Sequence, residues 1–151
     1  MSLEARVDQE LKQAMKAQDA VRVSTLRLFK AALRNAAIEK RQDQLPDADT
    51  LAILSRQIKQ RRESIEAYRK GGRADLIAKE EAELAILLVY EPPQLGDQEL
   101  QALIAKAIAS TGAAGPADQG RVMKQVMAEV QGRADGKRVS QAVATLLNHR
   151  A

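Results

Sequence analysis

The sequence predicts an all-α protein with a four-helix N-terminal lobe and a three-helix C-terminal lobe. Apolar residues recur every three or four positions along nearly the whole chain, which is the spacing of one helix face. Aromatic residues make up only 2% of the 151 residues, so the core must be built from Leu, Ile, Val, Met and Ala. Proline and glycine interrupt this pattern and separate it into helical segments.

Two helices are predicted in the first 41 residues. Asp19 is expected to cap the second helix, because its short carboxylate can accept free backbone N–H groups. This helix should end near Arg41, since the segment 42–49 contains Pro46 and three aspartates. The predicted apolar faces consist of Leu3, Val7, Leu11 and Met15 in the first helix, and of Leu26, Phe29, Ala32, Leu33 and Ala36 in the second.

The third helix is expected to have Asp47 or Asp49 as its N-cap. It should end at Gly71 and Gly72, because glycine adopts the left-handed C-cap conformation without strain. A fourth helix starts near Asp75 and includes the apolar run 84–90, whose leucines keep helical spacing and so argue against a strand. The inward residues are Leu51, Leu54, Ile58, Ile65 and Tyr68 in the third helix, and Leu76, Leu84, Leu87 and Leu88 in the fourth.

Pro92 and Pro93 cannot continue the fourth helix, because proline lacks a backbone N–H and restricts the residue before it. They mark the predicted boundary between domains of residues 1–92 and 96–151. Asp97 is expected to cap a fifth helix, and loops at 111–116 and 132–136 precede the sixth and seventh helices. The apolar residues are Leu100, Leu103, Ile104 and Ile108 in the fifth helix, Val122, Met123, Val126, Met127 and Val130 in the sixth, and Val139, Val143, Leu146 and Leu147 in the seventh. Both methionines are expected in the core.

The composition excludes several classes of protein. Without cysteine, the chain can form neither a disulfide scaffold nor a thiolate zinc site. Residues 1–19 contain no apolar signal-peptide core, and no stretch approaches the roughly 18–20 apolar residues that span a bilayer. We therefore expect a cytoplasmic protein that makes no contact with a membrane.

No motif predicts catalysis. The single histidine, His149, has no serine or cysteine partner in a nearby motif, and the chain contains no phosphate loop, dinucleotide fingerprint or metal-binding motif. Glu80, Glu81 and Glu83 form the best carboxylate cluster for acid–base chemistry. Because they point in different directions on a helix, a solvated acidic face paired with the preceding basic helix is the favoured interpretation. We expect no catalytic residue, metal or cofactor.

The net charge of +4 is spread unevenly. Residues 56–73 carry seven basic and two acidic side chains, whereas residues 75–99 carry seven acidic side chains and one lysine. We interpret the basic segment as a solvated helix face, since Lys59–Glu63 and Arg62–Glu66 have the i, i+4 spacing of ion pairs. Phosphate binding is the alternative for this segment.

The C-terminal segment is the strongest candidate for binding a polyanion. Residues 120–151 contain six basic and two acidic side chains. Their glycine-rich turn at 132–136 opens a helix, where backbone N–H groups and the helix dipole favour anions. The predicted RNA-binding residues are Arg133, Lys137 and Arg138 at this turn, with Arg121 and Lys124 in the preceding helix.

Several short strings stand out along the chain. In order, they are Thr25–Leu28, Ile58–Ile65, Gly72–Leu76, Lys79–Glu80 with Glu83, Tyr90–Leu95, Val122–Met123 and Gly132–Gly136. In this order, and in a chain of this length, these strings resemble the YqeY family. That family is related to the C-terminal part of GatB, a subunit of glutamine-dependent tRNA amidotransferase. Glu91 departs from the leucine expected at its position.

The resemblance implies four helices followed by three, and a C-terminal module that helps to hold tRNA while other domains perform the chemistry. It therefore favours a non-catalytic accessory module that binds tRNA, alone or beside an amidotransferase or another translation-related protein. The family label of carbon–nitrogen ligase with glutamine as donor finds no residues of its own in this chain. The alternative function is a protein-interaction adaptor with no RNA role.

Overall fold

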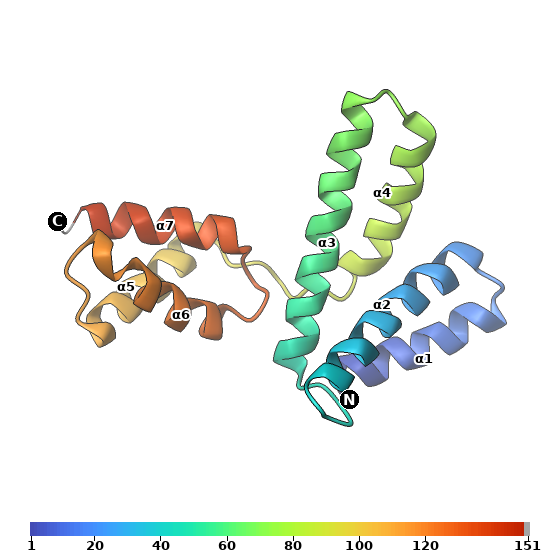
Figure 1. The fold of residues 1–151 in the computed structure, drawn as a ribbon, viewed down its shortest axis with the longest axis horizontal. Coiled ribbons are helices and arrows are strands. Elements are labelled where there is room, and N and C mark those ends of the chain that lie inside the picture. The colour runs from blue at the N-terminus through green and yellow to red at the C-terminus, as the bar shows by residue number, and fades with distance from the viewer. Residues whose placement is uncertain (150–151) are drawn as a thin grey trace. The chain divides into compact units, whose positions relative to one another are not determined.

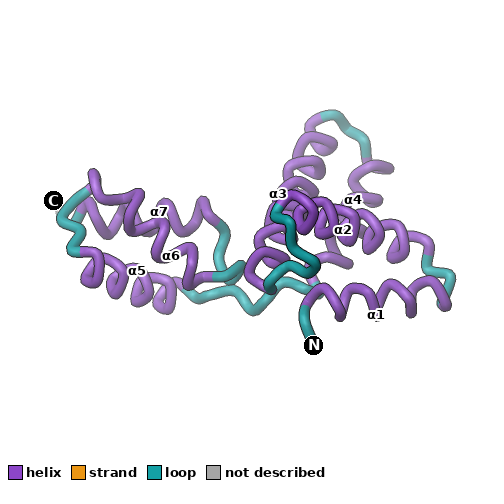
Figure 2. The backbone as a smooth tube through the Cα atoms, turned by 60° about the horizontal axis from the view of Figure 1, so that its bottom comes forward, coloured by secondary structure: helices purple, strands orange, loops and turns teal. Residues whose placement is uncertain are grey.

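The computed structural model describes residues 1–149, and this range confirms the all-α prediction with four helices followed by three (Figures 1 and 2). No strand occurs within the described range. The helices are α1 (Leu3–Lys16), α2 (Ala20–Glu39), α3 (Asp47–Lys70), α4 (Ala74–Leu88), α5 (Asp97–Thr111), the short 3₁₀ helix η1 (Pro116–Asp118), α6 (Gln119–Val130) and α7 (Gly136–Asn148).

The chain divides into two compact units, Met1–Glu91 and the residues from Pro92 onward. Each unit has its own cluster of buried apolar residues, as expected when each helix buries one stripe against its neighbours. No helix in the described part of the chain is both long enough and apolar enough to cross a membrane.

The N-terminal unit consists of two helical hairpins, α1 with α2 and α3 with α4 (Figure 1). Its core lies where the two hairpins pack together. Phe29 is completely buried there, and its ring lies 6.3 Å from the ring of Tyr90, measured between centroids. The other fully or nearly fully buried members include Val7, Leu11, Leu26, Leu33, Leu54, Ile58 and Leu87.

The C-terminal unit packs α5, α6 and α7 around a second core of aliphatic side chains. Two contacts join its entry segment to the turn between α6 and α7. The Leu95 backbone N–H donates to the Arg133 carbonyl at 2.7 Å, and the Gln94 side chain donates to the Gly132 carbonyl at 3.1 Å. The buried residues include Leu100, Ile104, Ile108, Val122, Val126, Val130, Val139, Val143 and Leu147.

Two predicted core methionines lie at the surface instead. Met15 is exposed, and Ala14 is buried in its place. Four-residue steps drift around a helix with 3.6 residues per turn, so the core face moves from Leu11 to position 14. Met127 is likewise exposed, because Val122, Val126 and Val130 form the buried line of α6, whereas Met123 packs against the core as predicted.

The predicted helix caps are partly correct. Asp19 caps α2, since its carboxylate accepts the Arg22 backbone N–H at 3.2 Å. Asp47 lies one residue inside α3, and its carboxylate accepts the Leu3 N–H at 3.0 Å rather than a group of its own helix. Asp97 also lies inside its helix, after the N-cap Gly96, and its carboxylate accepts a bond from Arg138. Tertiary partners at both positions take the side chain away from the capping role.

Candidate nucleic-acid interface

The five predicted RNA-binding residues lie in two groups in the C-terminal unit. Arg121 and Lys124 lie in the first half of α6, whereas Arg133, Lys137 and Arg138 lie at the α6–α7 turn and the start of α7. Because an α-helix rises about 1.5 Å per residue, Arg121 lies about 14 Å along the helix axis from the last residue of α6. Arg121 therefore stands at the opposite end of α6 from the second group, and Lys124 lies in the middle of the helix.

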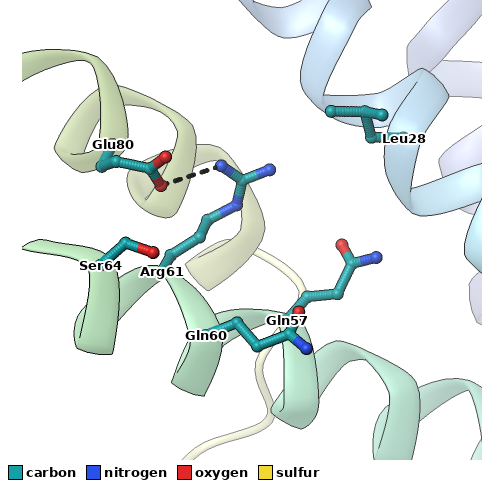
Figure 3. A pocket seen from close by; sticks show the side chains of 6 residues that line it. All are labelled: Leu28, Gln57, Gln60, Arg61, Ser64 and Glu80. Atoms are coloured by element: carbon teal, nitrogen blue, oxygen red, sulfur yellow. Dashed lines mark hydrogen bonds and ion pairs between the residues drawn. The ribbon is translucent and has the colours of Figure 1, made fainter. Parts of the chain in front are cut away.

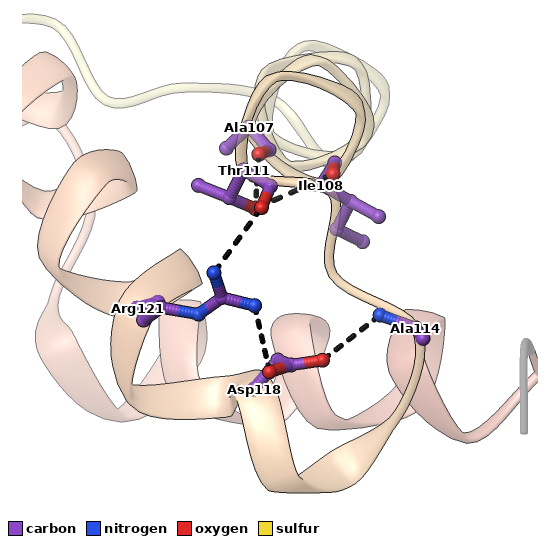
Figure 4. A network of polar contacts seen from close by, with 6 residues as sticks. All are labelled: Ala107, Ile108, Thr111, Ala114, Asp118 and Arg121. Atoms are coloured by element: carbon purple, nitrogen blue, oxygen red, sulfur yellow. Dashed lines mark hydrogen bonds and ion pairs between the residues drawn. The ribbon is translucent and has the colours of Figure 1, made fainter.

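Arg121 holds the loop before α6 in place. Its guanidinium donates to Asp118 at 2.7 Å and to the Thr111 carbonyl at 3.3 Å, as Figure 4 shows. Asp118 also accepts the Ala114 backbone N–H at 2.9 Å. The bond from Ala114, followed by that from Arg121, lowers the pKa of Asp118 below its ordinary value. Arg121 therefore has a structural role in addition to its charge.

Arg133 closes the end of α6. Its side chain donates to the Val130 carbonyl at 3.1 Å and to the Glu129 carbonyl at 2.9 Å. These carbonyls belong to the last turn of the helix, where no N–H of the helix itself can reach them. A cation at this position also interacts favourably with the negative end of the helix dipole.

The anion site expected at the start of α7 is occupied by the protein itself. Asp135 is the N-cap of α7, and its carboxylate accepts the Arg138 backbone N–H at 2.8 Å. The Arg138 side chain donates to Asp97 at 2.8 Å. A carboxylate thus stands where the sequence analysis placed a phosphate, because aspartate at an N-cap satisfies the same N–H groups and the same dipole.

Lys124 and Lys137 remain available for an external anion. Both are exposed, and neither forms an ion pair or a side-chain hydrogen bond with any residue between 1 and 149. The ammonium groups can therefore bind a phosphate without breaking a contact within the protein. The structure thus separates the five candidates into two unengaged lysines and three arginines that also hold loops or helix ends.

A cavity lined mainly by polar side chains lies in the N-terminal unit, between α2 and the α3–α4 hairpin. Its volume is about 300 Å³. Figure 3 shows the Arg61 guanidinium reaching Glu80 from α3, with Leu28 of α2 on the facing side. Arg61 pairs with Glu80 at 3.3 Å and also with Glu83. The other lining residues are Gln57, Gln60 and Ser64.

The acidic residues of α4 pair with the basic helix α3, as the sequence analysis expected. The expectation that the whole acidic face is solvated is wrong. Glu83 is only 7% exposed, so it is a buried charge and not part of a solvated face. It stays buried because Arg61 neutralises it, as a buried ion needs a partner. Among the described ion pairs, Arg69 bonds Glu81 across the hairpin, whereas Lys59–Glu63 and Arg62–Glu66 do not form.

A second polar cluster, not anticipated from the sequence, surrounds Glu10 in the N-terminal unit. Glu10 accepts hydrogen bonds from the Tyr90 hydroxyl, from Arg6 at 3.0 Å and from Arg22 at 3.2 Å. The Arg6 guanidinium also lies 5.0 Å from the centre of the Tyr90 ring, in a cation–π contact. Since Tyr90 and Glu10 are 80 residues apart, no local pattern predicts their contact.

The pKa values of this cluster shift in opposite directions. Burial alone would raise the pKa of Glu10, but the hydrogen bonds from Tyr90, Arg6 and Arg22 outweigh it, so the pKa is lowered. Burial, together with the bond to Glu10, raises the pKa of Tyr90 far above its ordinary value. Glu10 is therefore held ionised and Tyr90 neutral, which fits a structural contact.

The carboxylates of both clusters are engaged by arginine guanidinium groups. A general acid or base needs a pKa near the working pH, and the lowered pKa of Glu10 moves away from it. Within residues 1–149, no three His, Cys, Asp or Glu side chains are grouped so that they could hold a metal ion. Lys124 and Lys137 are therefore the candidates in the C-terminal unit for binding an external anion.

Comparison with known proteins decides the family. The model of the family described as Yqey-like protein matches residues 4–147 of the chain. The chain belongs to the YqeY-like family. The resemblance found in the sequence is thereby confirmed over nearly the whole length of this YqeY-like protein.

Curated relatives come from fungi. The chain is 32% identical over 141 residues to a protein of Pyrenophora tritici-repentis named "Altered inheritance of mitochondria protein 41, mitochondrial", with 91% of the chain and 77% of the relative covered. Proteins of the same name from Eremothecium gossypii and Kluyveromyces lactis are 37% and 29% identical, covering 57% and 83% of the chain. The matches span 47% and 68% of those two relatives.

The predicted cytoplasmic location is wrong by this comparison, because these relatives carry mitochondrial names. The sequence argument rested on the missing signal-peptide core and on the absence of cysteine. Neither feature distinguishes one reducing compartment from another.

Proposed function

We propose that this YqeY-like protein is a non-catalytic accessory module that binds RNA, with tRNA as the first candidate, through its C-terminal unit. The observation that carries the proposal is the pair of exposed, unengaged lysines, Lys124 and Lys137. They lie in a segment, residues 120–151, with six basic and two acidic side chains. Such cations bind a phosphate backbone by releasing its condensed counterions.

The three arginines can add contacts to a bound phosphate backbone. A guanidinium carries five N–H donors, and the contacts within the protein use only some of them. Arg133 bonds through Nε and Nη2, and Arg138 through Nη2, so each retains donors for a phosphate oxygen. Because these side chains are already held in place, binding RNA would cost them little rotamer entropy.

The resemblance to the tRNA-holding part of an amidotransferase subunit favours tRNA over other polyanions. We propose that the protein acts alone or beside an amidotransferase or another translation-related protein. We propose no ligase activity for the chain itself. Glu10 is held by Arg6, Arg22 and Tyr90, and Glu83 is held by Arg61. The sequence contains no cysteine nucleophile.

The test is tRNA binding by the purified full chain across a salt series. We expect measurable affinity at low salt, with the logarithm of the binding constant falling linearly with the logarithm of salt concentration. The variant Lys124→Ala/Lys137→Ala should bind more weakly and reduce the salt slope by about two, one unit for each phosphate contact. Arg133 and Arg138 are left intact because their loss would also disturb the fold.

The matched control is Lys12→Ala/Lys16→Ala, which removes the same charge from exposed positions of α1. It should leave the salt slope unchanged. Equal losses in both variants would show that only net charge matters and would overturn the site. Absence of binding at low salt would overturn the RNA role and leave the adaptor function as the better explanation.

A further inference from the structure

Helix α2 has a second apolar face outside the core of the N-terminal unit, where Leu28 also lines the cavity in front of the α3–α4 hairpin. Its core face buries Leu26, Phe29 and Leu33, together with Thr25 and Ala37. On the outside of the same helix, Val21, Leu28 and Ile38 are 47%, 56% and 65% exposed. Large apolar side chains gathered on one exposed face usually mark an interaction site.

The exposed residues follow the heptad spacing of a coiled coil. Val21, Leu28 and Asn35 are seven residues apart, and Ser24, Ala31 and Ile38 form a second set three residues later. All six positions are exposed. We assign the first set to the a positions and the second set to the d positions of a heptad. Together they form one continuous seam over 18 residues, which is about 26 Å long because a helix rises about 1.5 Å per residue. We call these six residues the α2 seam.

We propose that the α2 seam pairs with the same seam of a second copy of this chain, in a parallel two-helix arrangement. The first argument is Asn35. The other a positions, Val21 and Leu28, are apolar. A single asparagine at an a position favours a parallel, in-register dimer, because its side-chain amide can hydrogen-bond the amide of the same residue in the second copy. Serine and alanine at the d positions allow the two backbones to approach closely.

The second argument is charge. In a parallel pair, a g position faces the e position of the next heptad in the other helix. Arg34 occupies such a g position and faces Glu39 of the second copy, so the symmetric dimer gains two opposite-charge contacts. Both side chains are exposed, and neither forms an ion pair with a residue in the described part of the chain.

The remaining flank agrees with the parallel orientation. Arg27, one heptad before Arg34, faces Ala32 of the second copy, so no like charges meet there. In an antiparallel pair the g positions would face one another, and the arginines at 27 and 34 would repel. The seam lies on the side of α2 nearly opposite Leu26 and Leu33, so a second copy can approach without disturbing the core.

Sedimentation equilibrium of the full chain tests the pairing. At high micromolar concentration we expect twice the 16.5 kDa mass of one chain. Arg34→Glu should weaken association about tenfold or more, because both contacts become repulsive, and so should Glu39→Arg. The double variant Arg34→Glu/Glu39→Arg should restore it. Far-UV circular dichroism confirms that these surface variants remain folded.

Arg27→Glu is the matched control, since it makes the same change one heptad earlier, opposite a neutral residue. It should leave association nearly unchanged. If Arg27→Glu and Arg34→Glu weaken association equally, or if the double variant does not recover, the proposed register is wrong. A chain that remains monomeric at every concentration overturns the proposal and would leave the seam to a different partner.

Because the chain contains no cysteine, Asn35→Cys provides an independent test of orientation. A disulfide requires Cα atoms within about 7 Å, which two copies of position 35 satisfy only when the helices are parallel and in register. We expect a covalent dimer under mild oxidation. Lys12→Cys, exposed on α1, should not cross-link at the same rate. Equal cross-linking by both variants would indicate random collisions.

Discussion

At the scale of single residues, the Glu10 cluster is the most informative part of the N-terminal unit. Tyr90 is nearly buried and follows α4, yet its hydroxyl reaches a carboxylate on α1. A buried hydroxyl needs a hydrogen-bond partner, and an ionised carboxylate is a strong one. This bond therefore joins the end of the second hairpin to the beginning of the chain.

Tyr90→Phe should lower the free energy of unfolding by about 1.5 kcal/mol at neutral pH, the usual contribution of a hydrogen bond to a charged group. Urea denaturation measures the change. The half-buried Tyr68, whose hydroxyl makes no hydrogen bond within residues 1–149, supplies the control Tyr68→Phe, which should have little effect. A loss as large in the control would assign the effect to packing rather than to the bond.

The stability of the wild type should depend on pH through the same pair. The pKa of Glu10 is lowered by folding, so its contribution is present above the ordinary glutamate pKa of about 4.3 and is lost as pH falls through the folded value. The difference between wild type and Tyr90→Phe should therefore shrink in acid. On the alkaline side, the raised pKa of Tyr90 means that its contribution declines above about pH 10.

Urea midpoints measured from pH 7 to pH 3 check this dependence. Unfolding curves of the two proteins should converge toward the acid end of the series. A difference that stays constant across the whole range would show that Glu10 is not the titrating partner of Tyr90.

At the scale of helices, the ends are fixed by particular backbone conformations. Helix α5 ends at Gly112, which adopts φ = 67° and donates its N–H to the Ile108 carbonyl. A side chain at this left-handed position is strained. Gly120, by contrast, lies in the first turn of α6 with open space around the position of a Cβ atom.

Gly112→Ala should therefore destabilise the C-terminal unit by about 1 kcal/mol. Gly120→Ala should stabilise it by about 0.5 kcal/mol, because alanine has the higher helix propensity. Thermal unfolding followed by circular dichroism measures both. If both substitutions changed the stability in the same direction, the conformations assigned to Gly112 and Gly120 would be wrong.

At the scale of the whole molecule, the two units have separate cores, each formed by helices close in sequence. We propose that they are independent folding domains. A unit of about 60 residues buries only about 60% of its unfolded surface, so the C-terminal unit should be the less stable one.

Fragments 1–91 and 92–151 test this independence. Each should show a helical circular dichroism spectrum and a cooperative thermal transition, with the lower midpoint for the C-terminal fragment. The transitions of the fragments should reproduce those of the full chain in calorimetry. A fragment that is unfolded at low temperature would show that its core depends on the other unit.

The candidate RNA site could be predicted only in part. Charge and glycine spacing identified five candidate basic residues in the C-terminal unit. They did not show that Asp135 occupies the start of α7, or that Arg138 bonds Asp97, 41 residues earlier in the chain. Competition between an internal carboxylate and an external phosphate depends on which groups the fold brings within hydrogen-bonding distance.

The sequence by itself determined the helices, because periodicity, proline and glycine act over a few residues. It also contained the short strings that resemble the YqeY-like family, which the comparison then confirmed, and the heptad spacing of α2. Only the tertiary structure decided which faces are covered: Met15 and Met127 are exposed, Glu83 is buried against Arg61, and the α2 seam remains open. Burial and ion pairing depend on the packing of distant helices, which local patterns do not specify.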